Sequence, residues 1–131
     1  MRAIRELFRK LRYKINFVVK KNRLNVFYVS KQNSNNELTN LMNLYGSDKG
    51  GKNNDHNYAN YYSEIFFEKK NKIKNFLEIG LGTKNQNFVS NMGSKGVPLA
   101  SLRAWRDYFV NANIYGADID KNILKNEDRI Q

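Results

Sequence analysis

Apolar side chains recur at helical spacing in four segments of this chain, and apolar runs of strand length occur in three. The helical segments are residues 3–21, 37–46, 57–70 and 99–109. The strand-like runs are residues 24–30, 74–80 and 113–119. From residue 57 onward the order is helix, strand, glycine-containing loop, helix, strand. That order is typical of the opening of a doubly wound α/β domain.

Glycine and proline positions support these boundaries. Gly46 is placed to stop the helix 37–46, and Pro98 is suited to the first turn of the helix 99–109. Polar, glycine-containing stretches predict loops at 47–56 and 81–98. The predicted fold class is therefore α/β: an incomplete, Rossmann-like doubly wound sheet with two strands and flanking helices, preceded by a basic amphipathic helix.

Three of these elements should bury apolar side chains. The strand 74–80 is expected to be buried. The helix 57–70 is expected to bury a stripe of Tyr58, Tyr61, Tyr62, Ile65 and Phe66. The helix 99–109 is expected to bury Leu99, Leu102, Trp105 and Phe109, with Trp105 serving the core.

Positive charge is concentrated at the N-terminal end. The chain has 23 Lys and Arg against 12 Asp and Glu, and a net charge of +11. Residues 1–31 hold ten of the basic side chains against Glu6 alone, so the chain divides into a basic helix and short strand (1–31) and an α/β domain (32–131). The helix 3–21 has two interpretations: contact with an anionic membrane surface or nucleic acid, or docking of its apolar face on the domain or a second subunit.

Composition excludes several classes of protein. There is no cysteine, so neither a disulfide framework nor a thiolate metal site can form. No stretch approaches the length of a membrane span, and the apolar run 17–19 is too short for a secretory signal. We expect a cytoplasmic protein, with peripheral membrane contact through 3–21 as an alternative and without a specific nucleic-acid partner.

The end of the strand 74–80 carries the candidate chemistry. Ligands of open α/β sheets bind beyond the carboxyl ends of the strands, where glycines allow close approach of the backbone. Glu78, Gly80 and Gly82 lie at this end, and Asp118 lies at the end of the next strand, where it can accept hydrogen bonds from ribose hydroxyls. The third glycine of a dinucleotide motif is absent, which favours S-adenosylmethionine, a cofactor without a pyrophosphate.

Three sequence blocks together resemble a known family. "LEIGLGT", "SLRAWRDYF" and "IYGADID" look like the first half of a class I S-adenosylmethionine-dependent methyltransferase. The resemblance is closest to the bacterial O-methyltransferases of macrolide sugars and surface polysaccharides. The upstream "YGSDKG" and "HNYANYYSEIF" also resemble that group, so the similarity covers residues 38–131.

The resemblance implies roles for individual residues. Glu78, Gly80 and Gly82 would line the methionine and ribose side of the cofactor, and Asp118 would hold the ribose hydroxyls. The remaining candidates are His56, Tyr58 and Tyr62 for the methionine end or the substrate, Lys49 as the partner of a carboxylate, and Asp120 as an alternative to Asp118. For His56 the alternative is a loop histidine without a ligand, and for the two tyrosines it is core packing.

The resemblance also implies a reaction, the transfer of a methyl group to a hydroxyl of a sugar or other small molecule. Some family members use a divalent metal, whose ligands would lie beyond this chain. A complete domain of the family continues well past the second strand. We therefore expect this chain alone to be inactive, without an assignable catalytic base, and marginally stable or self-associating. The alternative function is an inactive remnant or interaction module that contacts a membrane surface or nucleic acid through its basic helix.

Overall fold

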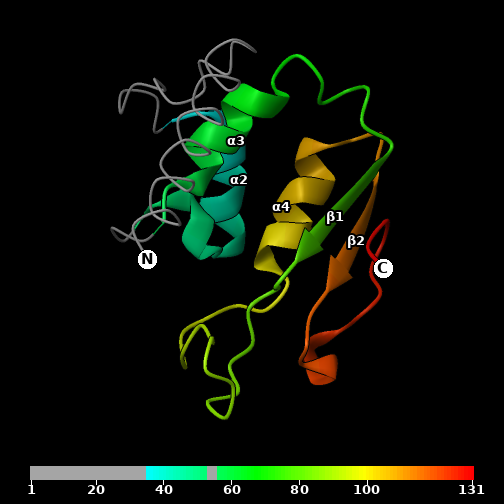
Figure 1. Cartoon of the computed structure of the whole chain (residues 1–131). Helices are drawn as coiled ribbons and strands as arrows, with labels where there is room; N and C mark the ends of the chain where they lie inside the picture. Colours follow the sequence, from blue (N-terminus) through cyan, green and yellow to red (C-terminus); the bar gives the residue numbers. More distant parts are fainter. Residues whose placement is uncertain (1–34, 53–55) are drawn as a thin grey trace, which may run out of the picture.

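The computed structural model describes residues 35–52 and 56–131 (Figure 1). The expected basic helix 3–21 and strand 24–30 lie outside these residues. The described elements are α2 (Glu37–Tyr45), η2 (Asp48–Gly50), α3 (Tyr58–Phe66), β1 (Asn75–Ile79), α4 (Ala100–Tyr108), β2 (Asn113–Ala117) and η3 (Lys121–Ile123), where η denotes a 3-10 turn. The predicted order of helices and strands after residue 37 is confirmed.

Helix α2 begins and ends at residues whose chemistry suits a helix terminus. The Asn36 side chain accepts a hydrogen bond from the backbone N–H of Thr39 at 2.9 Å. Gly46 follows the helix with a φ of 78°, and the N–H of Ser47 donates to the carbonyl of Met42 at 2.8 Å. A left-handed glycine closing a helix in this way satisfies carbonyls that the helix leaves free. The predicted stop at Gly46 is confirmed.

The sheet is parallel, with Glu78 of β1 opposite Gly116 of β2. The C-terminal residues continue it along the other edge of β2. The N–H of Ile114 donates to the carbonyl of Arg129, and the N–H of Gly116 donates to the carbonyl of Gln131, each at 2.8 Å. Two parallel strands with flanking helices form part of a Rossmann-like α/β fold.

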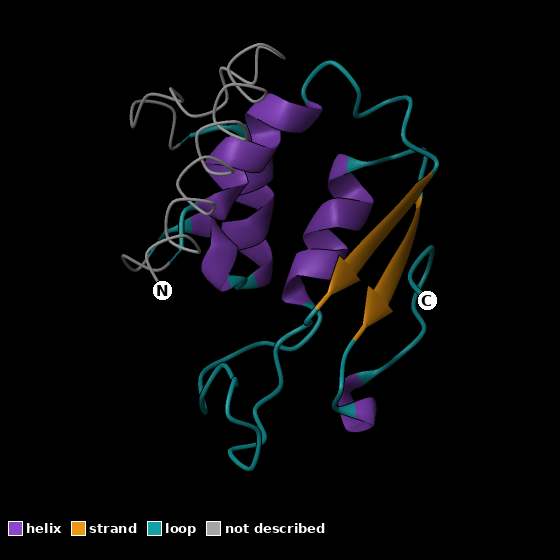
Figure 2. Cartoon of the chain, viewed as in Figure 1, coloured by secondary structure: helices purple, strands orange, loops and turns teal. Residues whose placement is uncertain are grey.

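The helices lie on one face of the sheet (Figure 2), and aromatic side chains form the core between them. Trp105 of α4 is 2% exposed and stacks on Phe109 with 5.3 Å between ring centroids. Phe66, from the end of α3, meets the rings of Trp105 and Phe76 edge-on, each at 5.9 Å. Tyr62 contacts Trp105 in the same way at 5.5 Å. The prediction that Trp105 serves the core is confirmed.

The opposite face of the sheet corrects one prediction. Leu77 and Ile79 of β1 are 58% and 79% exposed, so the strand 74–80 is not buried as expected. Side chains alternate along a strand, and within the described residues α2, α3 and α4 lie only on the face that carries Phe76 (Figure 1).

The expected stripe on the second helix is also partly wrong. Helix α3 ends at Phe66, and turns occupy residues 67–72. Tyr58, Tyr61 and Ile65 are at least 39% exposed, because α3 turns Tyr62 and Phe66 toward α4 instead.

The start of α4 differs in detail from the prediction. The helix begins at Ala100, and Leu99 before it has a φ of 64°, so Pro98 lies outside the first turn. A branched side chain with positive φ is strained. Burial of the Leu99 side chain, which is 2% exposed, opposes that cost.

Candidate ligand-binding site at the ends of the strands

A cavity of about 580 Å³ lies at the carboxyl ends of β1 and β2, between the loops that leave the two strands. Figure 1 shows these loops leaving the tips of the two arrows. Four of the predicted site residues line this cavity: His56, Gly80, Gly82 and Asp118. Lys49 lines it as well. The topology thus brings together residues that are up to 69 positions apart in the sequence.

The two glycines have different surroundings. Both have positive φ, 86° at Gly80 and 80° at Gly82, a conformation that other residues rarely adopt. A Cβ atom on Gly80 would meet nothing within 4 Å, so the backbone there is open to a ligand. A Cβ atom on Gly82 would lie 1.9 Å from the sulfur of Met92, so this glycine makes room for the loop above it.

Asp118 holds the two strand-end turns together. Its Oδ2 accepts a hydrogen bond from the N–H of Leu81 at 2.6 Å, and its Oδ1 accepts one from the N–H of Asp120 at 2.9 Å. Each carboxylate oxygen can accept a further hydrogen bond. Asp118 is half-buried and lines the cavity, so it retains acceptor capacity for a ligand.

Asp120 has a different environment. Its carboxylate accepts hydrogen bonds from the Thr83 hydroxyl and from the N–H of Asn122, and the residue is only 4% exposed. The hydrogen bond from Thr83 lowers the pKa of Asp120, partly opposed by desolvation. Asp120 is therefore used in holding the loop after Gly82, and Asp118 is better placed to meet a ligand.

Glu78 and Lys49 form a largely buried ion pair. Their Oε1 and Nζ atoms are 3.2 Å apart, and the Glu78 side chain is 10% exposed. The same Oε1 accepts a hydrogen bond from the Ser101 hydroxyl at 2.9 Å. Lys49 Nζ is also 3.6 Å from a carboxylate oxygen of Asp48. Pairing with a carboxylate, which the sequence left as one option for Lys49, is therefore present in the structure.

One carboxylate oxygen of Glu78 accepts no hydrogen bond from the described part of the chain. Its Oε2 is buried and has no hydrogen-bond partner among the described residues. Glu78 itself is not among the cavity-lining residues, and it contacts the cavity through Lys49. A buried carboxylate oxygen without a partner is costly, so this atom is suited to receive a donor.

The aromatic candidates separate into two groups. The His56 and Tyr58 rings stack in parallel with 4.9 Å between centroids. His56 lines the cavity, whereas Tyr58 is 46% exposed and lies against the histidine ring. Tyr62 packs against Trp105 in the core. Of these three residues, the structure places only His56 directly at the cavity.

A second cavity, of about 710 Å³, adjoins the first. The two share Asp48, His56, Asn91 and Met92 in their walls. The rest of the second wall is polar or glycine: Asn43, Gly46, Ser47, Lys52, Lys95 and Gly96. The site therefore consists of two adjoining cavities, and His56 lines both of them.

Sequence reasoning missed several wall residues. Thr83 could have been suspected because it follows Gly82 directly. Asn91 and Met92 lie in the middle of a loop without any distinctive motif, and only the folded chain brings them to the cavity.

The described residues contain neither a metal-binding cluster nor a membrane-spanning helix. In residues 35–52 and 56–131, no three His, Cys, Asp or Glu side chains converge as a metal site would require. Across the same part of the chain, no helix has the length and apolar character needed to cross a membrane.

The described residues form part of a Rossmann-like α/β domain with a cavity at the carboxyl ends of its two strands. No protein-family model matches the sequence, and no curated protein matches it. Solved structures of MycE, a methyltransferase of the mycinamycin biosynthetic pathway, do match. A structure of MycE with Mg and SAH (S-adenosylhomocysteine) aligns over 72% of this chain with 31% identity and a TM-score of 0.55.

A second MycE structure, which also contains mycinamycin VI, gives 30% identity, the same coverage and the same TM-score. The aligned part spans 23% of the MycE chain. These similarities support the S-adenosylmethionine-dependent methyltransferase class that the sequence blocks predicted.

Proposed function

We propose that this chain carries the cofactor-binding part of an S-adenosylmethionine-dependent O-methyltransferase that acts on a hydroxyl of a sugar or other small molecule. One observation supports this most: the strand-end cavity combines an open glycine, Gly80, with the carboxylate of Asp118. The similarity to MycE, whose solved structures contain SAH, supports the same cofactor class.

In this proposal each charged group has its own part of the cofactor. Asp118 accepts hydrogen bonds from the ribose hydroxyls with its remaining lone pairs. The chain of the cofactor passes over Gly80, where no side chain obstructs it. Lys49, held in place by Glu78, pairs with the carboxylate of the methionine portion.

The adjoining cavity is proposed to hold the methyl acceptor. Its wall is made mainly of amide, hydroxyl, ammonium and carboxylate groups, which suit a hydroxylated molecule better than an apolar one. Asn43 and Asp48 both line this cavity, and their Oδ1 atoms accept no hydrogen bond from any described residue, although Lys49 Nζ lies 3.6 Å from the Asp48 oxygen. Acceptor atoms of this kind match the donor hydroxyls of a saccharide.

The proposed reaction is an in-line displacement. A lone pair of the acceptor oxygen forms a bond to the methyl carbon while the bond from that carbon to sulfur breaks. The sulfonium becomes a neutral thioether, and the hydroxyl proton passes to a base. This chain contributes mainly alignment of the two molecules, because the reacting atoms must be held in line.

Calorimetric titration with S-adenosylhomocysteine tests the cofactor site. We expect micromolar binding by the wild-type chain and a loss of roughly tenfold or more in Asp118→Asn, because a charge-assisted hydrogen bond contributes about 1.5–3 kcal/mol. Asp118→Asn keeps an oxygen for the N–H of Leu81, so it separates binding from folding better than Asp118→Ala.

Asp128→Asn is the matched control, because its side chain is 87% exposed and lies away from the cavity. The control should bind as the wild type does. Absence of heat from a wild-type chain whose circular dichroism shows it folded contradicts the proposal.

A further inference from the structure

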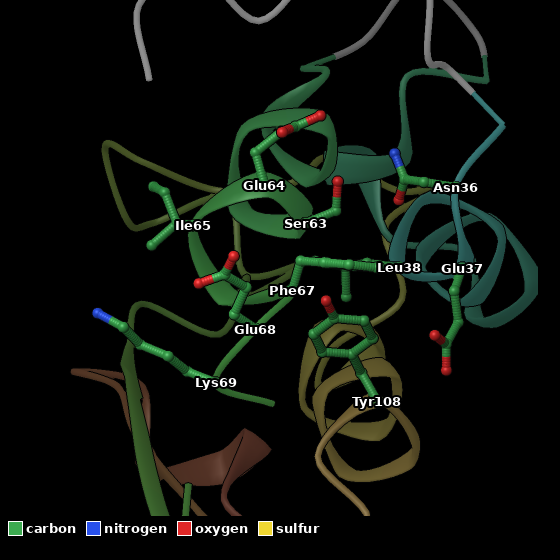
Figure 3. A pocket seen from close by; sticks show the side chains of 10 residues that line it. All are labelled: Asn36, Glu37, Leu38, Ser63, Glu64, Ile65, Phe67, Glu68, Lys69 and Tyr108. Atoms are coloured by element: carbon green, nitrogen blue, oxygen red, sulfur yellow. The ribbon is translucent and has the colours of Figure 1, made fainter. Parts of the chain in front are cut away.

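A cavity of about 420 Å³ lies on the helical side of the molecule, away from the strand-end site (Figure 3). It lies between the start of α2, the end of α3 and the last turn of α4. Of its apolar wall residues, Leu38 and Tyr108 are buried, whereas Ile65 and Phe67 are 40% and 74% exposed. We call this cavity and its wall residues, which include Glu64 and Glu68, the helical groove.

The helical groove is lined by three carboxylates and one cation, Lys69, so its wall has an excess of negative charge. Glu64 and Glu68 line it, and neither forms an ion pair within the part of the chain that the structure describes. Glu37, also in the wall, pairs with Lys70 at 2.5 Å. Unpaired carboxylates beside an apolar surface favour an occupant that has both cations and apolar side chains.

A hydroxyl without a hydrogen-bond partner among the described residues also faces the helical groove. Tyr108 is 2% exposed and extends from α4 into the cavity in Figure 3. Its hydroxyl forms no hydrogen bond with any described residue. Burial, with a smaller contribution from Glu37, raises the pKa of Tyr108 to about 12, so the hydroxyl remains protonated at neutral pH and can donate to an occupant.

The chain itself contains a segment with the required chemistry. Residues 3–21 combine apolar positions at helical spacing with seven Lys or Arg and a single Glu. Residues 22–34 connect this segment to Asn35, and Asn36 already lines the helical groove. Thirteen residues span at most roughly 45 Å when fully extended, which is enough to reach back over a small domain. A tether of this length gives an effective concentration on the order of millimolar.

We propose that residues 3–21 dock on the helical groove of the same chain. Their apolar side chains contact Ile65 and Phe67, and their Arg and Lys side chains pair with Glu64 and Glu68. The basic face is then used within the molecule instead of being presented to an external anion. This docking is independent of the proposed methyltransferase function, because the helical groove and the strand-end cavity have no wall residue in common.

The absence of cysteine allows a direct distance measurement on the full chain. Spin labels on Lys10→Cys and Lys72→Cys report whether the segment lies on the helical groove, and electron–electron double resonance gives the distance. Lys72 is exposed, follows the groove residues in the chain and is not part of the wall. We expect one narrow distance distribution, broadened at high salt because exposed ion pairs are screened.

Charge reversal tests the contacts. Glu64→Lys with Glu68→Lys should broaden the distribution, and adding Arg9→Glu with Arg12→Glu should restore it. The charge swap distinguishes lost pairing from a damaged helix, since a damaged α3 would not recover. Asp128→Lys is the control and should change nothing, because its side chain is 87% exposed and does not line the groove.

Three results would overturn the docking. The first is a broad distribution that the double reversal leaves unchanged. The second is a short distance between labels on two different, singly labelled chains, which would assign the segment to a second copy. The third is a narrow distribution that arises only after vesicles containing phosphatidylserine, or duplex DNA, are added.

Discussion

The strand-end cavity and the helical groove differ in whether their charged side chains are paired. At the strand ends, Lys49 is paired with Glu78 and Asp48, and Asp118 accepts two backbone N–H groups. In the helical groove, Glu64 and Glu68 form no ion pair with any described residue. A site whose charged groups are already positioned suits a small ligand, since little reorganisation is needed on binding. Unpaired charges around an exposed apolar surface suit a macromolecular segment.

Among the substitutions that test this comparison, Lys49→Met should have the largest effect on the free energy of unfolding. It leaves the Glu78 carboxylate, which is 10% exposed, without its cation. We expect the free energy of unfolding to fall by about 2–3 kcal/mol, because breaking a largely buried pair leaves an uncompensated charge. Urea denaturation measures this free energy. The exposed Lys125→Met is the control and should change stability little. Equal losses in both variants would show that the pair does not stabilise the fold.

Gly82→Ala should have the next largest effect. The substitution strains a residue at a φ of 80° and drives its Cβ against Met92, and we expect a cost of about 1–3 kcal/mol. Met92→Ala in the same chain removes the contact and should recover part of the loss, which thermal unfolding can measure. Gly80→Ala tests the strain alone, because its Cβ meets nothing within 4 Å. If Gly80→Ala costs as much as Gly82→Ala, the Met92 contact is unimportant.

Asp120 should give a smaller, pH-dependent effect. Its pKa is lowered in the folded chain, so its contribution to stability is present above the pKa of the unfolded chain, near 4, and is lost as the pH falls through the folded value. Thr83→Val removes the hydrogen bond that lowers this pKa. We therefore expect Thr83→Val to lose less stability than the wild type between pH 5 and about pH 3, measured by urea denaturation at each pH. Parallel curves for the two proteins would contradict the assignment.

The helical groove should give the smallest effect. Glu64→Gln and Glu68→Gln remove charges that have no described partner, so each should change the free energy of unfolding by at most about 0.5 kcal/mol. Urea denaturation at low salt measures both. A loss as large as that of Lys49→Met would remove the contrast between the two regions.

The elements of the described fold were largely predictable, whereas their burial was not. Helix α2 and its stop at Gly46 follow from local residue chemistry, which acts over a few positions. The exposure of Leu77 and Ile79 depends on which face of the sheet the helices cover. The choice of Tyr62 and Phe66 as the buried side of α3 depends on where α4 lies. No periodicity in a single segment contains that information.

The candidate site shows the same division. Gly80, Gly82 and Asp118 could be predicted to meet because parallel strands end at a common edge of a sheet. Their binding roles remain predictions for the titration with S-adenosylhomocysteine. The Thr83 contact with Asp120 and the placement of Met92 were not predictable, since they depend on the path of an irregular loop.

The sequence by itself determined the order of helices and strands, the glycine turns and the concentration of positive charge before residue 32. Backbone preferences and side-chain spacing act locally, so they can be read without a structure. Only the tertiary structure decided that Lys49 pairs with Glu78 and that unpaired carboxylates line the helical groove. These contacts join residues far apart in the chain, and their energies depend on burial, which exists only once the elements have packed.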